Sequence, residues 1–346
     1  MQQKNMIAVL TGVLCLALCV LMVNLVQLYR DIYQIPEQAV VDLCQTLAAD
    51  GIRLEASLVP RTREDGRIYV SDGAGYEENA ALLLADSRIK STYAIPNGQL
   101  FLHYNGDMTE FTDGFGFHYR RAGLAAEGRI VVSQNTVRDY EVLTAGLAEL
   151  SLTGSAAQAA TTFLDRQDGL LESDVTIETV VASVYGSETG RAYVRCLRQI
   201  DGAEITENSV ICLVENGVVV EAAGKWCFMT IGESYMAQLS DITNILFMMK
   251  RTLAGQGSDA PDCTIVGVER CYSLYLFGQD DGFCLIPCWR VETDTMGVLV
   301  FSALDGTLYT KRVREDLHMR TMTMSCKENE NPDRKPFPFA PIPVII

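Results

Sequence analysis

Apolar residues dominate the first thirty positions of the chain and predict one long helix. No residue between Lys4 and Arg30 is charged, so Asn5 to Tyr29 form an uninterrupted uncharged segment. About 20 apolar residues are enough to span a bilayer as a helix. A cleaved signal peptide would have a shorter apolar core and a small-residue cleavage site, which the segment lacks. We therefore expect residues 1–30 to form a cytoplasmic stub and a single transmembrane anchor. The N-terminus would be cytoplasmic and the bulk of the chain extracytoplasmic in the cell membrane.

Small residues recur along one face of this predicted helix. Ala8, Gly12, Cys15 and Cys19 are spaced four, three and four positions apart, which places them on the same side. Small side chains let transmembrane helices approach closely, because lipid supplies no hydrophobic drive between them. The spacing predicts a transmembrane interaction face for a partner helix. The alternative is that small residues are common in membrane helices and mark no contact here.

Beyond the anchor, the hydrophobic pattern changes repeatedly between helical and strand periodicity. Residues 31–152 are expected to form an N-terminal α+β domain, which Leu152-Thr153-Gly154 closes. Asn105-Gly106 is typical of a tight hairpin turn. The predicted helices of this domain cover residues 36–50, 77–85 and 136–150, and its predicted strands cover 52–60, 99–104 and 128–133.

From residue 153 the pattern runs through the same order of elements twice. The segments 153–232 and 233–325 each begin with a helical pattern, at 156–167 and 234–253, and each continues with strand patterns. Asn216-Gly217 and Asp305-Gly306 mark equivalent hairpin turns. The predicted fold class is therefore α+β, a transmembrane helix followed by repeated helix-plus-antiparallel-sheet units of PepSY-like form. The predicted strands are 175–185, 191–198, 209–214 and 218–222 in the first unit, and 263–275, 282–292, 297–302 and 308–312 in the second.

Three methionines at helical spacing in the second unit, Met236, Met248 and Met249, are expected to face the sheet as core residues. The alternative is a flexible binding groove. Residues 326–346 contain five of the ten prolines of the chain, and we expect them to form a flexible, Pro-rich tail.

The net charge of the chain limits the kinds of molecule that it is expected to bind. It contains 28 Lys+Arg and 44 Asp+Glu, a formal net charge of −16. Nucleic acid and anionic lipid head groups both require a positive surface. The composition therefore argues against nucleic-acid binding.

Residues that could carry chemistry are few and scattered. Nine of the eleven cysteines lie outside the predicted anchor, and this odd number cannot all pair within one chain. Most have apolar neighbours, which favours buried free thiols. Cys284 and Cys288 would share a strand face, but their spacing is not that of a usual zinc or redox pair. The three histidines lie in unrelated segments, and no nucleophile elbow, dinucleotide fingerprint or phosphate-binding loop is present. We expect no catalytic residues, no cofactor and no metal, and hence a protein that is not an enzyme.

The chain resembles the YycH/YycI-type regulators, YycI more closely, and the resemblance is strongest in a C-terminal module formed by about the last 80 residues. The resemblance is carried by Asp50-Gly51-Ile52, by Leu285-Ile286-Pro287-Cys288-Trp289-Arg290-Val291 and by Ser302-Ala303-Leu304-Asp305-Gly306-Thr307. The C-terminal module is also similar to PepSY-type modules. Within this module Pro287, Trp289, Asp305 and Gly306 are expected to be structural framework, because a Trp among strand residues usually packs in a core.

The resemblance implies a function in two-component regulation. A member of this family would be a non-enzymatic protein that modulates a WalK-type sensor histidine kinase by protein–protein contact, together with a companion YycH-type protein. Its outer domains and its transmembrane helix would make the contacts, and it could act as a homo- or hetero-dimer. Two alternatives stay open: a PepSY-like inhibitor or chaperone of an extracytoplasmic peptidase, and a cell-envelope hydrolase that uses unmarked carboxylates.

Overall fold

The computed structural model describes residues 2–63, 65–71, 89–96, 98–112, 116–123, 130, 136–168, 175–187, 190–226, 231–254, 262–277 and 282–309. Its residues divide into two compact units, each assembled from segments that are distant in sequence. Unit 1 takes its described residues from 2–66, 236–269 and 288–309, and unit 2 takes its own from 67–235 and 270–287. The predicted division at residues 30, 152, 232 and 325 follows sequence order and stays a prediction.

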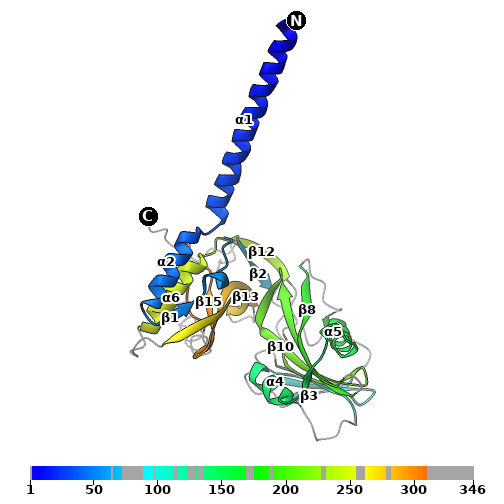
Figure 1. The fold of residues 1–346 in the computed structure, drawn as a ribbon. Helices are drawn as coiled ribbons and strands as arrows, with labels where there is room; N and C mark the ends of the chain where they lie inside the picture. The colour runs from blue at the N-terminus through cyan, green and yellow to red at the C-terminus, as the bar shows by residue number, and fades with distance from the viewer. Residues whose placement is uncertain are drawn as a thin grey trace, which may run out of the picture. The chain divides into compact units, whose positions relative to one another are not determined.

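Unit 1 has three helices among its described residues, and the second and third of them pack against short stretches of sheet (Figure 1). Its helices are α1 (Gln2–Tyr33), α2 (Glu37–Ala48) and α6 (Ile242–Ala254), with a 3₁₀ turn at Ala56–Leu58. Its strands are β1 (Ile52–Leu54), β15 (Gly297–Ser302) and parts of β13 (Cys263–Phe277) and β14 (Gly282–Thr293). The core forms where the apolar faces of α2 and α6 meet these strands. It includes Val40, Leu43, Leu47, Ile245, Met249, Ile265, Trp289 and Phe301.

Among the described residues, unit 2 contains most of the strands, including parts of β13 and β14, and two helices. The strands of the first half are β2 (Gly66–Ser71), β3 (Ile89–Ile95), β4 (Gly98–His103), β5 (Met108–Thr112), β6 (Gly116–Arg120) and β7 (Ala148–Glu149). Those of the second half are β8 (Ile177–Gly186), β9 (Arg191–Ile200), β10 (Ala203–Glu215), β11 (Val218–Lys225) and β12 (Ile231–Ala237). Helices α4 (Thr136–Thr144) and α5 (Ser155–Asp168) pack on this sheet. Trp226 lies in the core beneath α5, with 1% of its surface exposed.

The predicted fold class is wrong, because the described strands form one large mixed sheet rather than repeated helix-plus-antiparallel-sheet units. Strand β13 pairs in parallel with β1, at Ile52 opposite Cys263, and with β10, at Glu204 opposite Cys271. These pairs join strands that the prediction assigned to three separate domains. Hairpin turns leave a local signal in a sequence, whereas parallel pairing between distant segments leaves none.

The start of the second predicted repeat is also different. Residues 231–237 form strand β12, and helix α6 begins only at Ile242. Met236 therefore lies on a strand with 65% of its surface exposed, and of the three methionines only Met249 is fully buried. The predicted helices at 136–150 and 156–167 correspond to α4 and α5, while the predicted helix at 77–85 lies outside the described residues.

The structure also corrects the prediction of a membrane anchor. A helix needs about 20 predominantly apolar residues to cross a bilayer. Within the described ranges, no helix has the length and apolar character to span a membrane. The transmembrane and signal-anchor assignment, and the single-pass localisation built on it, are therefore wrong.

Gly306 lies in a turn whose left-handed backbone conformation favours glycine. Its backbone φ is +72°, and a Cβ there would collide with the Sδ atom of Met248 on α6. Gly297, in the same unit, has a φ of +73° but open space around its missing Cβ. An alanine at Gly297 therefore meets backbone strain alone, whereas an alanine at Gly306 meets backbone strain and the Met248 side chain.

We expect Gly306→Ala to lower the free energy of unfolding of unit 1 by about 2 kcal/mol, against about 1 kcal/mol for Gly297→Ala. Chemical denaturation followed by Trp289 fluorescence, in a shared Trp226→Phe background, measures both losses. Equal losses would show that Met248 does not restrict this turn.

Candidate functional site

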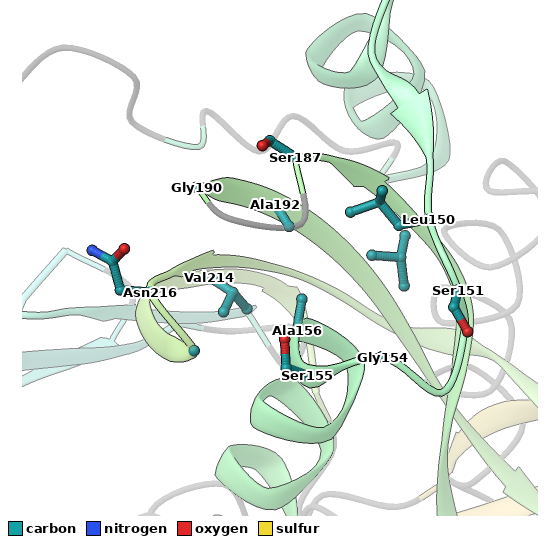
Figure 2. Close-up of a pocket in the computed structure, with 12 residues that line it drawn as sticks. Leu150, Ser151, Gly154, Ser155, Ala156, Ser187, Gly190, Ala192, Val214 and Asn216 are labelled. Atoms are coloured by element: carbon teal, nitrogen blue, oxygen red, sulfur yellow. The ribbon is translucent and has the colours of Figure 1, made fainter.

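A pocket of about 500 Å³ opens at one end of the unit 2 sheet (Figure 2). It lies where the β8–β9 connection, the β10–β11 turn and the N-terminus of α5 converge. Its volume lies in the range of ligand-binding pockets in proteins. Twelve residues line it: Leu150, Ser151, Gly154, Ser155, Ala156, Val184, Ser187, Gly190, Ala192, Val214, Asn216 and Gly217.

The floor and the rim of the pocket differ in character. Val184, Ala192 and Val214 form the floor, and each is almost completely buried. The rim consists of the other lining residues, most of them small or polar and exposed or half-buried, among them Ser155 and Ser187. In Figure 2, Ser187 lies on the connection between β8 and β9, and Ser155 lies at the start of α5. The pocket therefore offers a small apolar surface surrounded by hydroxyl and backbone groups.

The local sequence explains why backbone groups are accessible at this rim. Asn216 and Gly217 both have positive φ, 53° and 74°, as a two-residue hairpin turn between twisted strands requires. Helix α5 begins after Gly154, whose carbonyl accepts from the Gln158 N–H at 3.0 Å. The first N–H groups of a helix have no partner within the helix. Since Gly154 has no side chain to cap them, the helix start presents donors at the pocket.

One ion pair holds the two hairpin ends together beside the pocket. Arg191 on β9 and Glu215 on β10 are paired in register, and Arg191 Nη2 lies 2.6 Å from a carboxylate oxygen of Glu215. The hydrogen bond to Glu215 raises the pKa of the Arg191 guanidinium. The two charges compensate each other, so the pair adds no net charge to the rim.

A second polar cluster lies within the sheet of unit 2, around Glu221 on β11. Its carboxylate is completely buried, and one oxygen lies 2.9 Å from His118 Nε2 on β6. The other oxygen accepts from the Ile130 N–H at 2.9 Å. Arg120 Nε lies 3.9 Å away, and Glu110 lies 3.9 Å from the other nitrogen of His118. Several donors thus compensate a carboxylate that would otherwise be costly to bury.

Two tyrosine hydroxyls make further polar contacts in unit 2. The Tyr119 hydroxyl donates to Asp107 at 2.7 Å, and Asp107 also accepts from the Ala122 N–H. Burial raises the pKa of Tyr119, and the hydrogen bond to Asp107 raises it further. Tyr140 on α4 donates to the carbonyls of Ser183 and Tyr193, and burial raises its pKa to about 12. These hydroxyls therefore stay protonated at neutral pH and anchor helix and loop to the sheet.

Most of the described cysteine thiols outside α1 are buried. Of the cysteines that the structure describes outside α1, Cys44 is half-buried and the other six are buried. Burial raises the pKa of Cys284 to about 12, so this thiol is protonated and unreactive at neutral pH. Within the described residues, no group of three or more His, Cys, Asp or Glu side chains could hold a metal ion.

The structure places the predicted site residues in two separate regions of the chain. Ala8, Gly12, Cys15 and Cys19 fall within α1, where Cys15 and Cys19 are exposed. Their role as a helix contact stays a prediction. Pro287 and Trp289 lie on β14, and Trp289 Nε1 donates to the Ser240 carbonyl at 3.4 Å. Asp305 accepts from the Thr307 N–H at 3.1 Å and shapes the turn at Gly306. Trp289 is buried, and the framework role of these residues stays a prediction.

Sequence reasoning missed both clusters of unit 2. The pocket residues lie on elements that were predicted, but their convergence depends on how the hairpins and α5 pack. Glu221 did leave a signal, since it is the one charged residue in the apolar run Val218-Val219-Val220-Glu221-Ala222-Ala223. A charged residue in such a run needs buried partners.

Comparisons with known proteins leave the family open. No protein-family model matches the chain, and no curated protein matches it. Among solved structures, the chain is similar to an uncharacterized protein from Eubacterium rectale, with a TM-score of 0.44 and 11% sequence identity. That match covers 75% of this chain and 91% of the other. A likeness at this level carries no functional argument.

Proposed function

We propose that this chain is a non-enzymatic regulatory protein that binds another protein through the pocket of unit 2. The observation that carries the proposal is the chemistry of the lining. None of the twelve lining residues is Asp, Glu, His, Cys, Lys, Arg or Tyr. The three serines of the lining would need an adjacent base to act as nucleophiles, and the lining supplies none. The site is therefore suited to binding rather than to proton or group transfer.

The same lining suits an extended segment of a partner protein. The first N–H groups of α5, which have no partner within the helix, and polar groups at the two hairpin ends would hydrogen-bond to a peptide main chain. The floor of Val184, Ala192 and Val214 can take one small apolar side chain. Neither feature needs charge on the partner, so we expect the affinity to depend only weakly on salt.

The resemblance of the C-terminal module supports a sensor histidine kinase of the WalK type as the partner, with a YycH-type companion protein. A regulator of this kind changes kinase output by binding one kinase conformation more tightly than the other. Only differential affinity can move such an equilibrium, and a few kcal/mol are sufficient. The chemistry of phosphoryl transfer would stay entirely with the kinase.

Filling the pocket tests the proposal. We expect Ser155→Trp to abolish the effect of the full chain on autophosphorylation of a purified WalK-type kinase and to weaken binding at least about tenfold, because the indole occupies the space of the partner segment. Gln158→Trp is the matched control, since Gln158 is an exposed residue of the same helix outside the pocket. Equal binding by both variants would contradict the pocket as the binding site. A wild-type chain without any effect on the kinase would contradict the partner.

A further inference from the structure

Two turns of unit 2 contain the same dipeptide, Asn-Gly, at 105–106 and at 216–217. An asparagine before a glycine is open to attack by the main chain, because glycine has no side chain to shield its nitrogen. The glycine nitrogen bonds to the asparagine Cγ, a five-membered succinimide closes and ammonia leaves. One water molecule then opens the ring at either of its two carbonyls and leaves an aspartate or an isoaspartate. The reaction needs only water, and the dipeptide alone does not distinguish the two turns.

Asn105 is held by hydrogen bonds at the atoms that this reaction uses. Its Nδ2 donates to the Asp107 carboxylate at 2.8 Å, and its Oδ1 accepts from the Asp107 N–H at 3.1 Å. The attacking nitrogen is also engaged, since the Gly106 N–H donates to the His103 carbonyl at 3.0 Å. Asp107 is itself buried and accepts from the Tyr119 hydroxyl. Three hydrogen bonds must therefore break before the nitrogen can reach the Asn105 Cγ.

Asn216 has the same neighbour in sequence without these restraints. Its residue is exposed on the β10–β11 turn, and in Figure 2 its amide points away from the other lining residues. Among the residues that the structure describes, neither the Asn216 amide nor the Gly217 N–H has a hydrogen-bond partner. Neither the electrophilic carbon nor the attacking nitrogen is therefore held by the surrounding structure.

Conversion of Asn216 would change the pocket of unit 2 in two ways. Asn216 and Gly217 both line the pocket, and none of the lining residues is charged, so the new carboxylate would be the first charge in the lining. It would lie beside Glu215, whose own charge Arg191 already compensates at 2.6 Å. An isoaspartate also adds one atom to the main chain of a two-residue turn whose backbone twist matches the flanking strands. The hairpin end would no longer fit its present geometry.

We propose that Asn216 is a site of spontaneous deamidation, and that the resulting aspartate or isoaspartate alters the rim of the pocket of unit 2. The modification is independent of the proposed function. Only its consequence for kinase binding rests on that function, and there it would distinguish an aged chain from a newly made one.

Peptide mass spectrometry of the full chain, incubated at neutral pH, tests the modification. We expect the peptide that contains Asn216 to convert at least about tenfold faster than the peptide that contains Asn105, because the bonds around Asn105 must break first. The matched control is the same chain in concentrated urea, where these bonds are lost and both peptides should convert at similar rates. Equal rates in the native chain would overturn the inference. So would a native chain in which Asn216 stays unconverted while the denatured chain reacts.

The effect on the pocket is measured on the converted chain after its separation by ion exchange. We expect amide hydrogen exchange at the β10–β11 end to become faster than in the fresh chain, while exchange in α4 stays unchanged. Unchanged exchange at Val214 and Val218 in the isoaspartate form would overturn the proposed change of the rim. The converted chain should also lose affinity for the kinase. A fresh chain that does not bind the kinase would contradict the proposed function, and the conversion of Asn216 would still be decided by mass.

Discussion

Replacement of Glu221 by alanine is expected to lower the free energy of unfolding of unit 2 by about 3–5 kcal/mol. The carboxylate is fully buried and accepts from His118 and from the Ile130 N–H, both at 2.9 Å. Removing it leaves these two donors without their acceptor and takes away the negative charge that lies 3.9 Å from the buried Nε of Arg120. Breaking one side of a buried polar pair typically costs this much, because the desolvation of the remaining groups is no longer compensated.

Glu110→Ala is the matched control for Glu221→Ala. Glu110 also faces His118, but its side chain is 40% exposed and 3.9 Å away, so its loss should change stability by no more than about 1 kcal/mol. The measurement is urea denaturation in a Trp289→Phe background, where Trp226 reports unit 2 alone. If both glutamate variants lose the same small amount of stability, the cluster does not stabilise the sheet.

Replacement of Trp289 by alanine is the second large effect, and it should destabilise unit 1 by about 3–5 kcal/mol. The indole is 5% exposed and packs in the core between α6 and the strands of unit 1. Its N–H also donates to the Ser240 carbonyl. Loss of the ring leaves a cavity that the surrounding helices and strands can fill only in part.

Two measurements separate folding from recognition in this variant. Hydrogen exchange should show faster exchange in α2 and α6, while the fluorescence of Trp226 in unit 2 stays unchanged. Trp289→Phe retains most of the ring volume and should lose no more than about 1.5 kcal/mol. A Trp289→Ala chain with native exchange in unit 1 that fails to bind the kinase would contradict the framework role and place Trp289 in a binding surface.

Local signals predicted several of the helices and strands of this protein, although the strands at 66–71, 89–95 and 116–120 were not predicted. Val40, Leu43 and Leu47 recur at helical spacing, and all three are buried on α2. The turn at Asn216-Gly217 has the two positive φ values that this residue pair favours. Each of these features depends on residues close together in the chain, and short-range patterns report such features reliably.

These short-range patterns could not predict which distant strands pair with each other. The parallel contact of β1 with β13 joins residues more than two hundred positions apart, and nothing in either strand specifies the other. The strand at 231–237 was predicted as the start of a helix, because Met236, Leu239 and Ile242 also fit helical spacing. The pocket depends on both kinds of information, since its turns are local but their approach to α5 is tertiary.

The proposed function depends on the pocket of unit 2 as the contact with a kinase. One measurement tests this contact most directly. A photoreactive amino acid placed at Ser187, on the rim, should form a covalent adduct with the WalK-type kinase when the two purified proteins are mixed and irradiated. The same amino acid at Gln158, outside the pocket, should form none. Adducts mapped to one kinase segment from Ser187 alone are the predicted result. Equal adducts from both positions, or none from Ser187 while the proteins still bind, would contradict the account.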